Sequence, residues 1–228
     1  MKRSEVNRAV LWGLDIVMQN HFHLPPFGYW RLDEWKARWG EIGVIRELML
    51  GWDVTDFSSG DFARTGAVLF TLRNGRMDRP GTGTPYAEKL ILIRDGQWLP
   101  MHFHIQKTED IINRAGGVLA LRLYNADPET REPDRTGEVK VYMDGMERTV
   151  SPGEILEIGP GASITLTPYL YHAFGAKAGA GDLMAGEVSS VNDDRSDNYF
   201  AEDIGRFSAI EEDECILYPL CNEYDKIL

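Results

Sequence analysis

At 228 residues the chain is long enough for one large domain or two small ones with a substantial core. Hydrophobic residues make up 43% and charged residues 26%, an ordinary mixture for a globular protein. The formal net charge of −12 argues against a surface that binds nucleic acid or anionic membranes, because both need clustered Lys and Arg.

The first fifty residues have the spacing of helices. After Ser4, a candidate N-cap, apolar side chains recur every three or four residues as far as Met18. Pro25 and Pro26 break this pattern, and a second helical stretch follows Asp33, another candidate cap. Polar residues interrupt every apolar run, which predicts neither a signal peptide nor a membrane span. We expect residues 1–50 to form a helical extension.

From Gly51 the pattern changes to short β-rich runs separated by turn dipeptides such as Asn74-Gly75 and Asp144-Gly145. Many short strands with frequent turns favour an antiparallel sandwich or barrel over βαβ units. We therefore expect a mainly β fold in which residues 51–228 form one barrel domain. The expected strands are residues 67–72, 89–94, 101–105, 117–124, 138–143, 163–166, 172–174 and 182–189.

Cys215 and Cys221 are the only cysteines of the sequence. Two thiols do not make a disulfide framework in a chain of this size, and neither lies at metal-ligand spacing from a histidine. A reduced, cytoplasmic protein is the simplest interpretation.

Histidine is scarce, with five residues in the chain. His21 and His23 precede two prolines, and we expect them at the surface. His102 and His104 project from the same face of a strand, because residues i and i+2 do so. Glu109 follows after an interval that a tight turn could span. Two imidazoles and a carboxylate suit Mn²⁺, Fe²⁺, Zn²⁺, Co²⁺ or Ni²⁺, although a histidine pair on a barrel wall is the competing interpretation.

The residues around this pair favour the metal site. Gly96, His102, His104, Glu109 and Gly116 stand at the spacing of the first motif of the cupin superfamily, and the chain resembles that superfamily here. The resemblance implies a double-stranded β-helix, also called a jelly-roll barrel, that follows the helical extension.

The second cupin motif is less regular. Gly161, Pro168 and His172 take its glycine, proline and histidine positions, but the spacing departs from the usual form and no glycine separates Pro168 from His172. No other histidine remains in the β region. We therefore expect His172 to be the fourth ligand of one divalent metal ion.

The fuller pattern resembles bacterial D-lyxose isomerases over nearly the whole chain. The similar stretches are residues 85–89, 101–104, 107–114, 186–189, 192–194, 197–198 and 205–207. The resemblance implies a ketol-isomerase that acts on free sugars, usually with Mn²⁺, and that forms a homodimer. The implied reactions interconvert D-lyxose with D-xylulose and D-mannose with D-fructose.

Such a reaction needs a base that moves a proton between neighbouring carbons through a cis-enediol. Glu187, on a strand that could line the barrel, and Glu202, on a later loop, are both candidates. Lys89 is the candidate substrate-binding cation or proton donor. Three further residues are weaker candidates for contacts with the sugar, with a solvent-facing lysine or a loop ion pair as the alternative: Lys107, Asp197 and Arg206.

Two other functions compete with isomerisation. A cupin dioxygenase would use a similar ligand set with Fe²⁺ and consume oxygen. A non-catalytic sugar-binding cupin would keep the ligands and need no base. The residues alone leave open the native metal, the preference between lyxose and mannose, and the choice between proton transfer and hydride shift.

Overall fold

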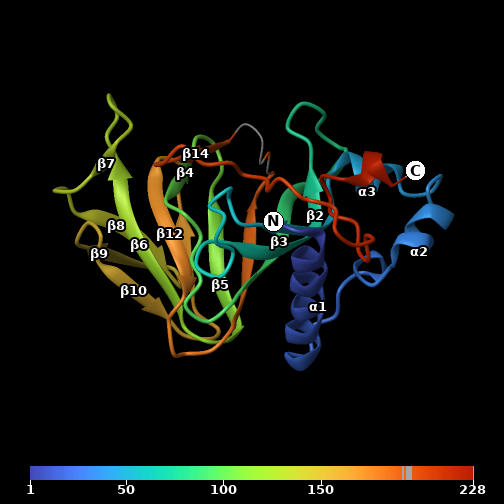
Figure 1. Ribbon diagram of the computed structural model, residues 1–228. Coiled ribbons are helices and arrows are strands. Elements are labelled where there is room, and N and C mark those ends of the chain that lie inside the picture. Colours follow the sequence, from blue (N-terminus) through green and yellow to red (C-terminus); the bar gives the residue numbers. More distant parts are fainter. Residues whose placement is uncertain (192, 194–196, 228) are drawn as a thin grey trace.

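The computed structural model describes residues 1–191, 193 and 197–227, so part of the stretch 192–194 lies outside the described residues. Helices dominate the first fifty residues, and the first strand begins at Gly51 (Figure 1). The helical segments are α1 (Arg3–Gln19), η1 (Pro26–Gly28), α2 (Leu32–Ala37), α3 (Gly43–Glu47) and, near the C-terminus, η2 (Tyr224–Lys226). None of the helices in these ranges combines the length and apolarity needed to cross a membrane.

The strands build two curved antiparallel sheets (Figure 1). The larger sheet has the order β1-β2-β3-β13-β5-β11-β8-β9, and the smaller has the order β10-β6-β12-β4-β14 with β7 beside β6. The strands are β1 (Gly51–Thr55), β2 (Ala67–Gly75), β3 (Gly83–Ile93), β4 (His102–His104), β5 (Glu109–Gly116), β6 (Leu119–Ala126), β7 (Pro133–Asp134), β8 (Val139–Met143), β9 (Met146–Val150), β10 (Ile155–Ile158), β11 (Ser163–Leu166), β12 (Leu170–Ala176), β13 (Leu183–Ser190) and β14 (Asn198–Phe200). The predicted mainly β architecture with N-terminal helices is confirmed.

The main core lies between the two sheets. Ile91 and Ile111 from the larger sheet meet Leu121, Leu123 and Phe174 from the smaller one, and all five side chains are buried. Side chains alternate between the two faces of a strand, so each strand of the larger sheet sends a row of residues into this space.

These inward rows change from apolar to polar toward one end of the barrel. On β3 the buried row that contains Ile91 continues to Lys89, and on β5 the row that contains Ile111 continues to Glu109. On β13 the row continues in the same way from Ala185 to Glu187. The three strands are neighbours in the sheet, so their polar residues meet at one place inside the barrel.

Gly116 ends β5 with a positive φ of 85°. A Cβ atom at this position would overlap the carbonyl oxygen of Asp182. The glycine of the sequence motif is therefore required both by its backbone conformation and by the close approach of a second chain segment.

Helix α1 covers the outer face of the larger sheet (Figure 1). Val6, Val10 and Leu14 pack in a second core with Phe70 of β2 and Leu92 of β3. The apolar periodicity of the first twenty residues thus predicts the buried face of this helix, except at Met18, which is 56% exposed.

Both predicted helix caps were wrong, because each helix begins before the residue chosen. Lys2 precedes α1 and Arg31 precedes α2, and their backbone N–H groups donate to Glu5 and Glu34 at 2.7 and 3.1 Å. The glutamate of the first turn therefore satisfies the preceding backbone donor, which a search for Ser or Asp caps does not find.

Ser4, one of the two predicted caps, instead lies inside α1. Its backbone N–H and its hydroxyl each donate to the Asp213 carboxylate at 2.8 Å. His21 and His23, by contrast, are exposed as predicted.

The C-terminal segment returns to these helices (Figure 1). Arg3 is fully buried and donates to Glu212 at 2.7 Å and to Glu223 at 2.5 Å. Farther along the chain, Trp35 stacks on Tyr224 with ring centroids 4.7 Å apart. The last residues of the chain thus attach the helical segments to the barrel.

Candidate active site

Three histidines converge inside the barrel from two neighbouring strands. His102 and His104 lie on β4, and His172 lies on β12 directly opposite His102 in the strand pairing. All three are buried, and one nitrogen from each ring lies within 4.8 Å of the other two. The two sequence motifs therefore meet, although His172 comes 68 positions after His104 in the chain.

The hydrogen bonds of two rings determine which nitrogen faces the centre. Nδ1 of His102 lies 2.8 Å from the Pro100 carbonyl, and Nδ1 of His172 lies 2.9 Å from the Leu170 carbonyl. A carbonyl oxygen only accepts, so each Nδ1 carries a hydrogen, and in a neutral ring the Nε2 atom then presents a lone pair. The two Nε2 atoms lie 3.1 Å apart.

This arrangement fits a cation. Burial, and after it the neighbouring His172 and His104, hold the pKa of His102 well below its usual value, so its ring stays neutral. Neither ring nitrogen of His104 has a hydrogen-bond partner among the described residues. Neutral imidazoles with converging lone pairs are the donors that divalent first-row metals use.

Glu109 supplies a carboxylate to the same centre. It begins β5, and its Oε1 atom lies 3.2 Å from Nε2 of His172 and 3.4 Å from Nε2 of His104. Its other oxygen lies 2.6 Å from Nζ of Lys107. Burial opposes ionisation, yet the charge of Lys107 and then the contacts with His104 hold the pKa of Glu109 well below its usual range. The carboxylate is therefore ionised and lies against two of the three histidines.

Glu187 lies beside this centre with two lysines. Its Oε1 atom is 3.0 Å from Nζ of Lys107 and 3.6 Å from Nζ of Lys89, and the Ser189 hydroxyl donates to it at 3.2 Å. Lys89 and Glu187 are direct partners in the pairing of β3 with β13. Lys89, Lys107 and Glu187 are each at most 4% exposed. Two buried cations thus hold two buried carboxylates, one of which faces the histidines.

Asp197 holds the turn that leads from the histidines to Glu109. Its Oδ1 atom accepts the backbone N–H groups of Ile105 and Gln106 at 3.1 and 2.8 Å, and its Oδ2 atom accepts that of Lys107 at 3.0 Å. The carboxylate is buried. Its observed role is structural, and a direct contact with a sugar stays a prediction.

Arg206 and Glu202 occupy different positions relative to this cluster. Arg206 pairs with Asp53 of β1 at 2.8 Å and lines the small cavity that His102 and His104 also line. Glu202 is exposed on the loop after β14, and it is not among the residues that line this cavity. Of the two glutamates expected as a base, the structure brings only Glu187 to the cluster.

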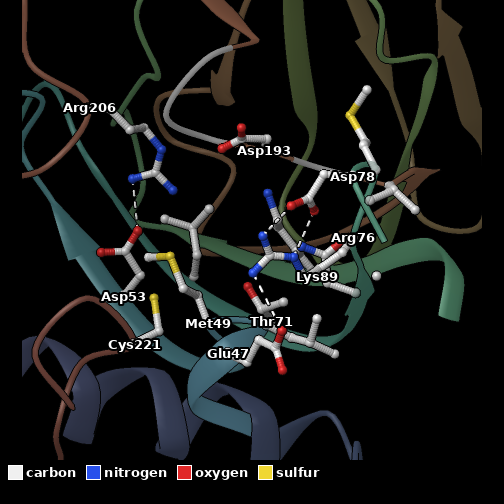
Figure 2. A pocket seen from close by; sticks show the side chains of 16 residues that line it. Glu47, Met49, Asp53, Thr71, Arg76, Asp78, Lys89, Asp193, Arg206 and Cys221 are labelled. Atoms are coloured by element: carbon white, nitrogen blue, oxygen red, sulfur yellow. Dashed lines mark hydrogen bonds and ion pairs between the residues drawn. The ribbon is translucent and has the colours of Figure 1, made fainter. Parts of the chain in front are cut away.

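A small cavity of about 40 Å³ at the cluster lies next to a larger one of about 440 Å³. Both are lined by Leu69, Lys89 and Arg206. Figure 2 shows the larger cavity, with Lys89 on its inner wall and Arg206 with Asp53 to one side. A small molecule in the larger cavity would thus lie next to the buried space that Glu187 lines.

Sequence reasoning missed several residues around the cluster. Ser189 stands two positions after Glu187, and this spacing on one strand is a signal that could have found it. Asn198 and Phe200 of β14 pair with His104 and His102, respectively. No local pattern indicates this pairing, because β14 is a three-residue strand far along the chain.

Comparison with known proteins identifies the family. A family model described as D-lyxose isomerase matches residues 1–224. Two relatives named D-lyxose/D-mannose isomerase, from Escherichia coli O157:H7 and Serratia proteamaculans, are each 45% identical over 228 residues and 98% of both chains. This chain belongs to the D-lyxose isomerase family. As a member of it, the chain is an enzyme of the sugar isomerase class.

Solved structures agree with the fold. An L-ribose isomerase variant from Acinetobacter sp. DL28, in complex with L-ribose, aligns with a TM-score of 0.61 at 14% identity and covers 92% of this chain and 98% of its own. L-ribose isomerase from Geodermatophilus obscurus aligns over the same shares with a TM-score of 0.56 at 18% identity. At these identities the likeness concerns the fold alone, and the cupin-type barrel predicted from the motifs is confirmed.

Proposed function

We propose that this chain is a metal-dependent aldose–ketose isomerase that interconverts D-lyxose with D-xylulose and D-mannose with D-fructose. Its main support is the 45% identity, over nearly the full length, to relatives whose names contain both aldoses. The buried Glu187 beside three convergent histidines adds a chemical reason, because isomerisation needs a base next to the group that holds the sugar oxygens.

In this proposal His102, His104, His172 and Glu109 hold one divalent metal ion, with Mn²⁺ expected before Co²⁺, Zn²⁺, Fe²⁺ or Ni²⁺. A metal ion held by these residues would supply Lewis acidity, which would stabilise the negative charge that develops on the sugar oxygens. The low pKa values of His102 and Glu109 keep these donors deprotonated at neutral pH, as metal binding requires.

Glu187 is the proposed base. It removes the proton from C2 of the aldose and returns a proton to C1, with a cis-enediol between the two steps. Lys89, whose Nζ lies 3.6 Å from the Glu187 carboxylate, assists the transfer of the hydroxyl proton from O2 to O1. Lys107 bridges Glu109 and Glu187 and holds both carboxylates in place. Arg206, on the cavity wall, is the proposed contact for the sugar hydroxyls.

The deciding experiment uses protein stripped of metal with a chelator. Each candidate ion is added back singly, and the ketose formed from D-lyxose and from D-mannose is measured together with dissolved oxygen. We expect ketose to form only after an ion is restored, with no oxygen consumed. Oxygen uptake with Fe²⁺ and no ketose would favour a dioxygenase, and sugar binding without any turnover would favour a binding protein.

Labelled water separates the two routes of isomerisation. Proton transfer through Glu187 allows deuterium from D₂O to enter the carbon skeleton of the product, whereas a hydride shift between C2 and C1 does not. We expect carbon-bound deuterium in product isolated after turnover in D₂O. Its complete absence would count against the base mechanism.

We also infer that the protein is a homodimer, as the family resemblance implies, and that it is cytoplasmic, in line with its low cysteine content. Light scattering at micromolar concentration is expected to give twice the chain mass of 25.8 kDa. A mass equal to one chain would contradict the dimer and leave the isomerase proposal untouched.

A further inference from the structure

The larger cavity is much bigger than the reaction described above requires. Its volume of about 440 Å³ lies within the range of about 300–1,000 Å³ that holds drug-sized ligands, whereas a pentose or hexose is a far smaller molecule. The cavity meets the reacting end at Leu69, Lys89 and Arg206, which line both spaces. A sugar whose C1 and C2 lie near Glu187 would therefore point its distal carbons into open space.

The charges that line this space favour a neutral occupant. Arg76 pairs with Asp78 at 2.6 Å, and Arg206 pairs with Asp53 at 2.8 Å (Figure 2). Among the described lining residues, four are acidic and three are basic, and the basic Lys89 also contacts Glu187. A phosphate or carboxylate on the distal end of a sugar would compete with carboxylates that already pair with these cations.

Neutral hydroxyl groups suit the same lining. The wall includes the hydroxyl of Thr71 and the amide of Asn74 as well as several carboxylates, and all of these can hydrogen-bond a polyol chain. An enzyme excludes a longer substrate when a wall of the site blocks its extra atoms. One added carbon changes the selectivity between two substrates by only about 1–3 kcal/mol, even in a close-fitting pocket. Among the described residues that line this cavity, none forms such a block.

We propose that this cavity is a distal subsite that lets the enzyme isomerise neutral aldoses of seven or more carbons. The proposal rests on the isomerase function and extends its substrate class. The reaction is balanced without any co-reactant, because the hydrogen removed from C2 is replaced by one at C1 and the O2 hydrogen passes to O1. The additional carbons take no part in it.

The test compares D-mannose with an aldoheptose that has the D-manno configuration from C2 to C5. Purified, metal-loaded enzyme is assayed with each sugar, and the ketose product is measured by chromatography. We expect kcat/KM for the heptose to lie within about tenfold of that for D-mannose. A heptose value more than tenfold lower would overturn the subsite. Failure to convert D-mannose or D-lyxose would instead reject the isomerase proposal, so the two failures are distinguishable.

Variants that fill the cavity give the second measurement. Met77 and Val191 line it and lie outside the catalytic cluster, and Met77 is 50% exposed, so a larger side chain there should be tolerated by the fold. We expect Met77→Trp or Val191→Trp to lower kcat/KM for the heptose at least tenfold while the value for D-mannose stays within about twofold. Met146→Trp, at a 54% exposed position of β9, is the matched control and should leave both values unchanged. An unchanged ratio of heptose to mannose activity in both cavity variants would overturn the proposal.

Discussion

At the scale of single residues, the arrangement around Glu187 separates the two candidate bases. Glu187 is buried beside Lys89 and Lys107, whereas Glu202 is exposed. Replacing Glu187 by Gln keeps the shape of the side chain and removes its capacity to accept a proton. We expect Glu187→Gln to lower kcat by about 10²–10⁴-fold with metal content unchanged.

Glu202→Gln is the matched control for this substitution. We expect near-normal kcat for it, measured with D-mannose in the same metal. Full activity in Glu187→Gln would show that Glu187 is not the base. A large loss of activity confined to Glu202→Gln would show that Glu202 is the base instead.

Asp197 is expected to act on the site through the backbone. Its carboxylate accepts hydrogen bonds from three backbone N–H groups of the turn that precedes Glu109. An asparagine amide has one oxygen and one NH₂ group, so at least one backbone N–H would face another donor and lose its hydrogen bond. Asp197→Asn should therefore weaken metal binding by about 10–100-fold, the usual effect of losing a residue that orients ligands.

Metal affinity measured by competition with a chelator checks this prediction. Asp203→Asn, at an exposed acid of the neighbouring loop, is the control and should bind metal like the unaltered protein. An Asp197→Asn protein with full metal affinity and lost activity would show that the residue contacts the sugar directly instead.

At the scale of elements, α1 and the C-terminal segment are joined by acid groups whose ionisation matters. The hydrogen bond from Arg3 lowers the pKa of Glu212 below its ordinary 4.5, and those from Ser4 lower the pKa of Asp213 below its ordinary 3.8. A lowered folded-state pKa means stabilisation that is complete above the ordinary value and is lost as pH falls through the folded value. We expect this attachment to weaken below about pH 4.5.

Thermal unfolding of the Asp213→Asn variant tests this attachment. Its Tm should lie below that of the unaltered protein at pH 7, and the difference should shrink as pH falls below the ordinary value of 3.8, because Asp213 then takes up a proton when the chain unfolds. A difference that stays constant from pH 7 to pH 3 would show that the charge of Asp213 does not contribute.

At the scale of the whole molecule, metal binding and folding are expected to be coupled. The four donors come from β4, β5 and β12, which lie in two different sheets, so they assemble only in the folded barrel. A ligand that binds only the folded state stabilises it by about 2.7 kcal/mol at a concentration 100 times its Kd.

Chelator treatment should therefore lower Tm, and re-addition of the ion should restore it. His104→Ala, which loses a donor with no other hydrogen-bond partner among the described residues, should show a much smaller change. Identical Tm values with and without saturating metal in the unaltered protein would contradict the proposed site.

The sequence by itself determined the barrel, the helical extension and the convergence of His102, His104 and Glu109. These features follow from short-range spacing: period-two strands, period-3.6 helices and a compact motif bounded by Gly96 and Gly116. The family resemblance likewise depends on short stretches of sequence, each of which can be recognised without knowledge of the contacts between distant segments.

The tertiary structure decided what depends on contacts between distant segments. The choice of Glu187 over Glu202 required the pairing of β13 with β3 and β5, which places one glutamate inside the barrel and leaves the other in solvent. The backbone contacts of Asp197, the ion pair of Arg206 with Asp53 and the large cavity next to the site arise in the same way. Burial and partner choice are properties of the assembled sheets, and no local pattern in the chain encodes them.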